Sequence, residues 1–369
     1  MEALVNSKRV LTKLPIAEEV SLESVQILKK LAQAHRFLAE LKGVAKSIPN
    51  EGILITTLTL QEAKDSSAIE NIFTTHDQLF QANVIQGQKI NQAAKEVENY
   101  RAALWKSYRQ TKITKLIRFE DILSIQALIE PNKPGIRKLP GTVIGNSRTR
   151  QVIYTPPQHP SEIEDLLVNL VEYINDNKLS ALDPLIKMAI IHHQFESIHP
   201  FYDGNGRAGR IINILYLVKS GLLDLPILYL SRYIVRSKDD YYRLLQSVRD
   251  QKNWQGWVLY IIEGIEITAK ETIEFVNQIR QLIMATKQRM RSELPKIYSQ
   301  ELLNNLFFHP YTKVQFLIEQ LGVSRITATK YLNELTEQDF VSKHKVGRTN
   351  FYVNEPLVEL IRRQEEIEL

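Results

Sequence analysis

His199-Pro200-Phe201-Tyr202-Asp203-Gly204-Asn205-Gly206-Arg207-Ala208-Gly209-Arg210 is the most informative run of this sequence. It combines an imidazole, a carboxylate, glycines and two guanidinium groups. A carboxylate beside phosphate oxygens suits Mg²⁺, glycines let backbone N–H groups approach phosphate closely, and arginines form forked hydrogen bonds to phosphate. A histidine next to these groups can accept a proton from an attacking group. The run therefore predicts a site for a nucleoside triphosphate.

The sequence on both sides of this run predicts helices. Apolar residues recur at helical spacing in 182–195, and residues 211–218 are apolar almost all round, which is typical of a buried helix that ends at Gly221. Residues 204–209 match the dinucleotide fingerprint GxGxxG, but that fingerprint requires a preceding strand. A Rossmann fold is therefore excluded. The run opens a buried helix, whose N-terminus attracts anions.

The run also carries a family resemblance. It matches HPFx(D/E)GNGRxxR, the signature of the Fic family, at every defined position. The resemblance implies a mainly α fold, a Fic-type helical bundle with a β-hairpin flap. It also implies a protein adenylyltransferase (AMPylator), a nucleotidyltransferase that moves AMP from ATP to a Tyr, Ser or Thr hydroxyl of a target protein. Such enzymes use Mg²⁺ and release pyrophosphate.

The resemblance assigns roles to the residues of the run. His199 is expected to be the general base for the target hydroxyl, and Asp203 to hold Mg²⁺ between the α- and β-phosphates. Arg207 and Arg210 are expected to bind the β- and γ-phosphates. The phosphates are also expected to contact Asn205 and nearby backbone amides. The remaining residues of the predicted nucleotide-binding loop are Gly204, Gly206, Ala208 and Gly209.

Three further residues near the run are expected to be structural. Phe201 is expected to be a core anchor. His192 and His193 do not have the i, i+4 spacing of a zinc-binding helix, and no supporting carboxylate is evident beside them. We therefore expect both histidines to be packed or hydrogen-bonded rather than to bind metal.

A second motif lies far upstream. Thr59 and Glu62 have the spacing of a capping box, which predicts a helix over about 59–76 with Thr59 as its N-cap. Within it, residues 66–71 (SSAIEN) fit (S/T)xxxE(G/N), the inhibitory-helix motif of Fic proteins. The three defined positions of the motif are Ser66, Glu70 and Asn71.

The resemblance implies that Glu70 inhibits the enzyme by pairing with Arg210 in the nucleotide site. A carboxylate and a phosphate oxygen compete for the same guanidinium, so this pair would deny the γ-phosphate its partner. Two alternatives stay open. The motif is an ordinary solvated helix face, or Glu70 orients water for the removal of AMP from modified protein.

A hairpin is predicted before the central helices. Residues 142–144 and 151–154 are short β-prone runs around Gly145-Asn146-Ser147. Fic proteins have a flap here, and the resemblance implies that a target segment docks on residues 142–154 as an added strand. Basic residues around the hairpin favour acidic targets. They are Arg137, Lys138, Arg148 and Arg150.

Aromatic residues follow the central helix. An adenine base needs a flat apolar wall, and we select Tyr242 over Tyr241 for it. Trp254 and Trp257 are expected to be core residues. Other helices are predicted over 22–41, 88–108 and 118–129.

The C-terminal sequence predicts a winged helix-turn-helix domain. Helices over 312–321 and 324–335 flank a turn at Gly322, and strands over 340–343 and 350–353 follow. Basic side chains could face DNA phosphates. They are Arg325, Lys330, Lys343, Lys345 and Arg348. We favour protein docking or a homodimer over DNA binding.

The chain of 369 residues is expected to have three parts: an N-terminal helical region (1–110) with the inhibitory helix, a Fic catalytic core (111–290) and the winged helix (291–369). It has no cysteine, which favours a reducing compartment. No apolar run is long enough to span a membrane, so a cytoplasmic location is expected. A DNA-binding regulator with a relic enzyme domain is the alternative function, but the 199–210 run has lost none of its chemical groups.

Overall fold

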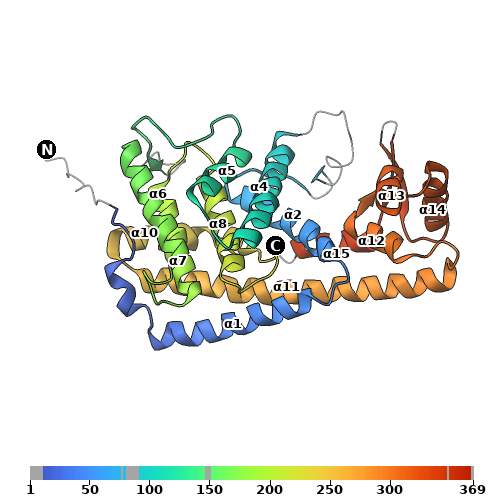
Figure 1. Ribbon diagram of the computed structural model, residues 1–369, viewed down its shortest axis with the longest axis horizontal. Coiled ribbons are helices and arrows are strands. Elements are labelled where there is room, and N and C mark those ends of the chain that lie inside the picture. Colours follow the sequence, from blue (N-terminus) through green and yellow to red (C-terminus); the bar gives the residue numbers. More distant parts are fainter. Residues whose placement is uncertain (1–10, 76–77, 80–90, 146–150, 347–348, 367–369) are drawn as a thin grey trace. The chain divides into compact units, whose positions relative to one another are not determined.

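The computed structural model describes residues 11–75, 78–79, 91–145, 151–346 and 349–366, and it is mainly helical, as predicted (Figure 1). The chain forms two compact units. The first consists of Met1–Leu38, Asn99–Pro226 and Tyr233–Ile267, and the second of Ala39–Glu98, Ile227–Arg232 and Thr268–Leu369. The division at residues 110 and 290 stays a prediction. No described helix is long and apolar enough to cross a membrane.

Four of the described helices contain residues assigned to both units. They are α1 (Val25–Ala45), α4 (Gln92–Thr114), α9 (Leu230–Arg236) and α11 (Trp254–Glu293). Helix α1 begins and ends later than the predicted 22–41, and α4 runs later than the predicted 88–108. The short 3₁₀ helix η1 (Ala17–Ser21) precedes α1.

The centre of the first unit is a stack of helices. These are α5 (Phe119–Ile129), α6 (Pro160–Asn175), α7 (Pro184–Ile198) and α8 (Asn205–Lys219). Helix α7 packs against both α6 and α8, and α5 packs on α8 (Figure 1). Every residue of α7 from Leu185 to Ile198 is buried. The predicted buried helix after the 199–210 run is therefore confirmed as α8, which is buried from Arg207 to Val218.

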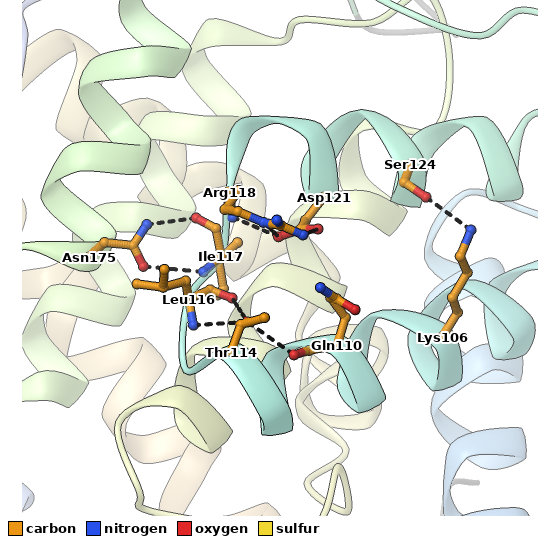
Figure 2. A network of polar contacts seen from close by, with 9 residues as sticks. All are labelled: Lys106, Gln110, Thr114, Leu116, Ile117, Arg118, Asp121, Ser124 and Asn175. Atoms are coloured by element: carbon orange, nitrogen blue, oxygen red, sulfur yellow. Dashed lines mark hydrogen bonds and ion pairs between the residues drawn. The ribbon is translucent and has the colours of Figure 1, made fainter.

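A polar network fixes the start of α5 (Figure 2). Asp121 accepts hydrogen bonds from the backbone N–H of Arg118, at 2.9 Å, and from its guanidinium. Asn175, in the last turn of α6, bonds both the N–H and the carbonyl of Ile117. The hydrogen bonds of Asn175 hold the start of α5 against α6. Helix α5 in turn supports the loop that precedes α8, through Gln126.

An aromatic layer covers the other side of α7. It includes residues of α10 (Lys238–Gln251) and α11. Trp254 and Trp257 are buried, as predicted, and the indole N–H of Trp257 donates to the carbonyl of Ala189 on α7 at 2.7 Å. The layer therefore fixes the position of α7 through both packing and a buried hydrogen bond.

In the second unit, helix α2 (Glu51–Ile69) contains the predicted inhibitory motif, but its bounds differ from the expected 59–76. Asn50 is the N-cap and accepts a hydrogen bond from the N–H of Gly52 at 2.9 Å. Thr59 lies in the middle of the helix, where its hydroxyl donates to the carbonyl of Ile55. The capping-box prediction at Thr59 and Glu62 was therefore wrong.

The end of α2 also falls earlier than predicted. Glu70 is the C-cap, and Asn71 takes a left-handed conformation with φ of 63°. Glycine and asparagine tolerate this conformation best. The G/N position of the motif is therefore the residue at which this helix ends.

Helix α2 is fixed by buried polar contacts within the second unit. Glu62 accepts hydrogen bonds from the hydroxyl and the N–H of Ser231. Asp65 lies 3.8 Å from the guanidinium of Arg232, and Arg232 also donates to the carbonyl of Gln364 at 2.6 Å. Gln364 belongs to the C-terminal helix α15 (Glu355–Glu366). Residues 227–232 therefore connect α2 to the C-terminal helix.

The remaining C-terminal elements follow the order of a winged helix. They are α12 (Gln300–Phe308), β3 (Tyr311–Thr312), α13 (Val314–Leu321), α14 (Arg325–Glu337), β4 (Ser342–Val346) and β5 (Thr349–Val353). The strands form one antiparallel sheet in the order β3-β5-β4. The predicted helix over 312–321 starts later, because Thr312 pairs with Tyr352 in the sheet. Helix α12 also packs against α2.

Candidate active site

His199 is the residue that ends α7. It is the C-cap in a left-handed conformation, with φ of 47° and ψ of 59°, and its N–H bonds the carbonyl of Phe195 at 3.0 Å. A non-glycine residue adopts this conformation only when its surroundings hold it there. His199 is half-buried, and its ring Nδ1 atom is enclosed. The candidate base therefore lies in a constrained turn at the end of a buried helix.

The loop between α7 and α8 is closed by Asn205. Its side chain accepts a hydrogen bond from the N–H of Phe201 and donates to the Phe201 carbonyl, both at 2.9 Å. Phe201 is fully buried, as expected of a core anchor. Gly204 is the N-cap of α8 with φ of 81°, a conformation that favours glycine. Both polar atoms of the Asn205 side chain therefore order this loop, and the expected contact of Asn205 with phosphate stays a prediction.

Asp203 and Arg207 lie together at the start of α8. The Arg207 guanidinium is 3.5 Å from the Asp203 carboxylate and 3.8 Å from the carboxylate of Glu130. Arg207 is 2% exposed, whereas the Asp203 side chain is 57% exposed. The Asp203 carboxylate is thus open to solvent, whereas the Arg207 guanidinium is buried.

Helix α5 supports this loop through Gln126, which is fully buried. Its side-chain amide donates to the carbonyls of Lys133 and Asp203 and accepts from the N–H of Gly135. Sequence reasoning missed Gln126 and Glu130, because neither belongs to a motif and both act on residues far along the chain.

Gly209 and Ala208 lie in the buried part of α8. A Cβ atom at Gly209 would lie 2.5 Å from Oε1 of Glu196 and 3.0 Å from a ring carbon of Phe195. Glycine is therefore needed where α8 approaches α7 closely, and the expected contact of Gly209 with nucleotide stays a prediction. Arg210, one residue further, is 2% exposed.

Gly209→Ala is expected to lower the free energy of unfolding by about 1–3 kcal/mol, since the added methyl group overpacks the contact between α7 and α8. Thermal unfolding followed by circular dichroism would measure it. Gly43→Ala is the matched control, because Gly43 is an exposed position of α1 with no atom within 4 Å of its added Cβ. That change should leave the midpoint equal or raise it. Equal midpoints for both variants would contradict the packing argument.

His192 and His193 are packed, as expected. His192 hydrogen-bonds the hydroxyl of Tyr241 at 2.9 Å and stacks on Trp257. Burial lowers the pKa of His192 to about 3 and that of His193 well below its usual value. Both are therefore neutral at physiological pH. Among the described residues, no group of three or more His, Asp and Glu side chains could hold a metal ion.

The two candidate tyrosines differ in exposure. Tyr241 is buried and bonded to His192, whereas Tyr242 is 44% exposed. Their rings lie 5.1 Å apart in an edge-on arrangement. Tyr242 thus has the accessible surface that an adenine wall requires, and this role stays a prediction.

The predicted hairpin consists of β1 (Ile144–Gly145) and β2 (Val152–Tyr154), which pair antiparallel. Val143, Val152 and Ile153 are exposed apolar residues. The turn residues Asn146 and Ser147, with Arg148 and Arg150, lie outside the described residues. Exposed apolar side chains on so short a hairpin suit a surface to which an extended peptide could bind as an additional strand.

Arg137 does not belong to a basic docking surface, contrary to the sequence prediction. It is fully buried, and its guanidinium donates to the main-chain carbonyls of His199, at 2.8 Å, and Pro157. A charged side chain is buried where such acceptors compensate it. Lys138 beside it is exposed.

Of the inhibitory motif, Ser66 is fully buried in α2, while Glu70 and Asn71 at its end are exposed. These residues belong to the second unit and Arg210 to the first. The pairing of Glu70 with Arg210 stays a prediction.

Two family models match this chain. Residues 28–109 match the Fic/DOC family N-terminal model, and residues 282–357 match the protein adenylyltransferase SoFic-like, C-terminal domain. The chain is 28% identical over 193 residues to protein adenylyltransferase fic-1 of Caenorhabditis elegans, covering 52% of this chain and 35% of that protein. It is 31% identical over 185 residues to a probable protein adenylyltransferase of Aquifex aeolicus, covering 48% and 53%. The chain thus spans about half or less of these relatives.

A solved structure shares the fold. A Fic family protein from Desulfovibrio desulfuricans G20 matches with a TM-score of 0.55 and 20% identity, over 90% of this chain and 96% of that chain.

Proposed function

We propose that this chain transfers AMP from ATP to a Tyr, Ser or Thr hydroxyl of a target protein, because residues 28–109 and 282–357 match Fic-type family models and its relatives are named protein adenylyltransferases. The observation that carries this proposal is the arrangement of the loop before α8. A partly exposed histidine, an exposed carboxylate and a buried arginine lie within nine residues at the N-terminus of a buried helix. These groups suit nucleotidyl transfer, because that reaction depends mainly on positioning and charge neutralisation.

His199 is the proposed general base. The target hydroxyl oxygen attacks the α-phosphorus of ATP, the bond from that phosphorus to the bridging oxygen breaks, and pyrophosphate leaves. His199 accepts the hydroxyl proton during the attack. The N–H groups at the start of α8, together with Arg207 and Arg210, would hold the phosphates.

Asp203 is the proposed protein ligand of Mg²⁺. The single exposed carboxylate fits this ion, because Mg²⁺ with nucleotides takes most of its ligands from phosphates and water. When bound, the ion would neutralise charge on the α- and β-phosphates. Arg207, 3.5 Å from the Asp203 carboxylate, helps to orient it.

Asp203→Ala is expected to weaken Mg²⁺-dependent ATP binding and to lower transfer at least about tenfold, since the ion loses its protein ligand. Calorimetric titration with ATP, with and without Mg²⁺, would measure the binding. Asp165→Ala on the exposed face of α6 is the control and should change neither quantity. ATP binding that is equally Mg²⁺-dependent in parent and Asp203→Ala would remove Asp203 from this role.

The hairpin over residues 142–154 is the proposed docking site for the target. Pairing along a strand uses main-chain hydrogen bonds and makes little demand on the target's sequence. It would deliver a hydroxyl to the nucleotide site. With Arg137 buried and Lys138 exposed, the described residues give limited support for an acidic target.

Glu70 is the proposed inhibitor of this reaction, in competition with the γ-phosphate for Arg210. A second candidate role for Glu70 is to orient water for the removal of AMP from modified protein. The two roles predict different results for Glu70→Gly: inhibition predicts faster AMP transfer, and water orientation predicts loss of AMP release from modified protein.

The test of the proposed function is label transfer. Purified protein would be incubated with ATP, GTP, UTP and CTP, each labelled at the α-phosphate, alone and with a protein extract. Of the four nucleotides, only ATP is expected to label protein, and the labelling should require Mg²⁺. Label from another nucleotide only, or none from any nucleotide even with Glu70→Gly, would refute adenylylation.

For the C-terminal domain we propose a role in protein docking or homodimerisation. Residues 299–369 contain eight Lys and Arg against ten Asp and Glu, a balance that disfavours DNA phosphates. The exposed face of α14 mixes Arg325 and Lys330 with Glu334 and Glu337, and Lys330 pairs with Glu334. Tight, salt-sensitive binding to duplex DNA would favour the alternative of a DNA-binding regulator.

A further inference from the structure

The end of α7 is capped by side chains from three other segments. The last carbonyls of a helix have no partner inside the helix, so other groups must bind them. Here each main-chain carbonyl from Glu196 to Pro200 accepts a hydrogen bond from outside α7. These five residues lead directly into and past the candidate base, His199.

The donors come from both sides of the hairpin and from α10. Arg249 on α10 donates to the Glu196 carbonyl at 3.3 Å. The Tyr154 hydroxyl on β2 donates to the Ser197 carbonyl at 2.9 Å. Arg137, ahead of β1, donates its guanidinium to the Ile198 carbonyl at 3.5 Å and the His199 carbonyl at 2.8 Å, and its backbone N–H to the Pro200 carbonyl at 3.0 Å.

These donors also contact one another. The Arg249 guanidinium lies over the Tyr154 ring, 4.0 Å from its centre, and donates to the hydroxyl of Ser197 at 3.1 Å. Gln246 on α10 donates to the carbonyl of Ile153 on β2. Burial raises the pKa of Tyr154, so its hydroxyl keeps its proton and remains a donor at physiological pH. The contacts thus join α10, the hairpin and the end of α7.

We propose that Arg137, Tyr154 and Arg249 are positioning residues that hold His199 in its left-handed turn, and that Tyr154 links the base to the hairpin on which the target docks. This inference rests on the proposed function of His199. None of the three side chains needs to touch ATP. Each acts by fixing main-chain carbonyls within three residues of His199.

The hydrogen bond of Tyr154 couples the hairpin to the turn at His199. A peptide that pairs with the hairpin would restrict the motion of β2 and, through Tyr154, that of the turn. The base would therefore be best ordered when a target is in place.

Tyr154→Phe removes one hydroxyl and keeps the ring under Arg249, so it tests the link with little risk of unfolding. Tyr108→Phe is the matched control, because the buried Tyr108 hydroxyl also donates to a main-chain carbonyl, that of Asp224, at 3.0 Å. Both variants lose a hydrogen bond to a main-chain carbonyl, and Tyr108→Phe also loses the bond that the Lys112 ammonium donates to this hydroxyl at 2.9 Å. The unfolding temperature of Tyr108→Phe should therefore fall at least as far as that of Tyr154→Phe.

We expect Tyr154→Phe to lower kcat for label transfer to protein about five- to tenfold with an unchanged KM for ATP, the size of effect that one neutral hydrogen bond can produce. The Tyr108→Phe control should keep the parent kcat. Arg137→Lys retains the charge, but an ammonium group lacks the planar fork that reaches two carbonyls at once. This variant should therefore lower kcat at least as much as Tyr154→Phe does.

A second measurement does not depend on activity. In full-length protein with ¹³C-labelled histidine, the His199 ring signal is assigned by its loss in His199→Gln. Tyr154→Phe should shift or broaden that signal and leave those of His159 and His344 unchanged. An unchanged His199 signal together with an unchanged kcat would overturn the proposal and leave Tyr154 a purely structural residue. If neither the parent nor Glu70→Gly transfers AMP, the proposed function fails, yet the ring signal still decides whether Tyr154 positions His199.

Discussion

His199→Ala is expected to abolish transfer of AMP to protein, with a rate at least roughly 100-fold below that of the parent, the range over which a lost general base acts. ATP should still bind. The imidazole acts on the target hydroxyl, while the phosphates are expected to depend on the N-terminus of α8 and on Arg207 and Arg210. Label transfer from ATP measures the rate, and calorimetric titration measures ATP binding.

His159→Ala is the control for this experiment. His159 is exposed at the N-cap of α6, and its side chain makes no capping hydrogen bond. The control should transfer AMP at the parent rate. Transfer by His199→Ala at the rate of the control would show that another group accepts the hydroxyl proton.

Glu70→Gly is expected to raise transfer, by about tenfold or more. A charge-assisted hydrogen bond between Arg210 and Glu70 would no longer compete with the γ-phosphate, and bonds of this kind contribute about 1.5–3 kcal/mol. The gain should disappear in Glu70→Gly combined with Arg210→Ala, because the freed partner is then absent. Initial rates of label transfer for parent, single and double variants complete the cycle.

Asp176→Gly is the matched control for Glu70→Gly. It too replaces an exposed carboxylate at a helix C-cap by glycine, at the end of α6. It should leave transfer unchanged. If Glu70→Gly leaves transfer unchanged and abolishes the release of AMP from modified protein, Glu70 orients water, and the main reaction is de-adenylylation.

The parts of the site that were predictable lie within one run of sequence. The helix–loop–helix around residues 199–210, the buried α8 and the packed histidines all follow from local pattern and spacing. Their supporting residues do not. Gln126 bonds the carbonyl of Asp203, 77 residues away, and no local pattern indicates such a partner.

Two errors have physical causes of the same kind. Thr59 and Glu62 have the sequence spacing of a capping box, but Asn50 caps the helix earlier and Glu62 bonds Ser231. Arg137 is predicted from the sequence to be a surface charge near the hairpin, but it is buried, because the carbonyls at the end of α7 accept its hydrogen bonds. In both cases tertiary partners decide which of two locally reasonable structures forms.

The anchoring of α2 limits how inhibition by Glu70 could be relieved. Moving the whole helix would break the buried contacts of Glu62 with Ser231 and of Asp65 with Arg232. Separating a buried ion pair alone typically costs about 3–5 kcal/mol. Rotation of one exposed side chain at the helix end requires far less and takes place within nanoseconds. Within the second unit, the Glu70 carboxylate can therefore change its orientation by fast side-chain rotation alone, while α2 keeps its buried contacts.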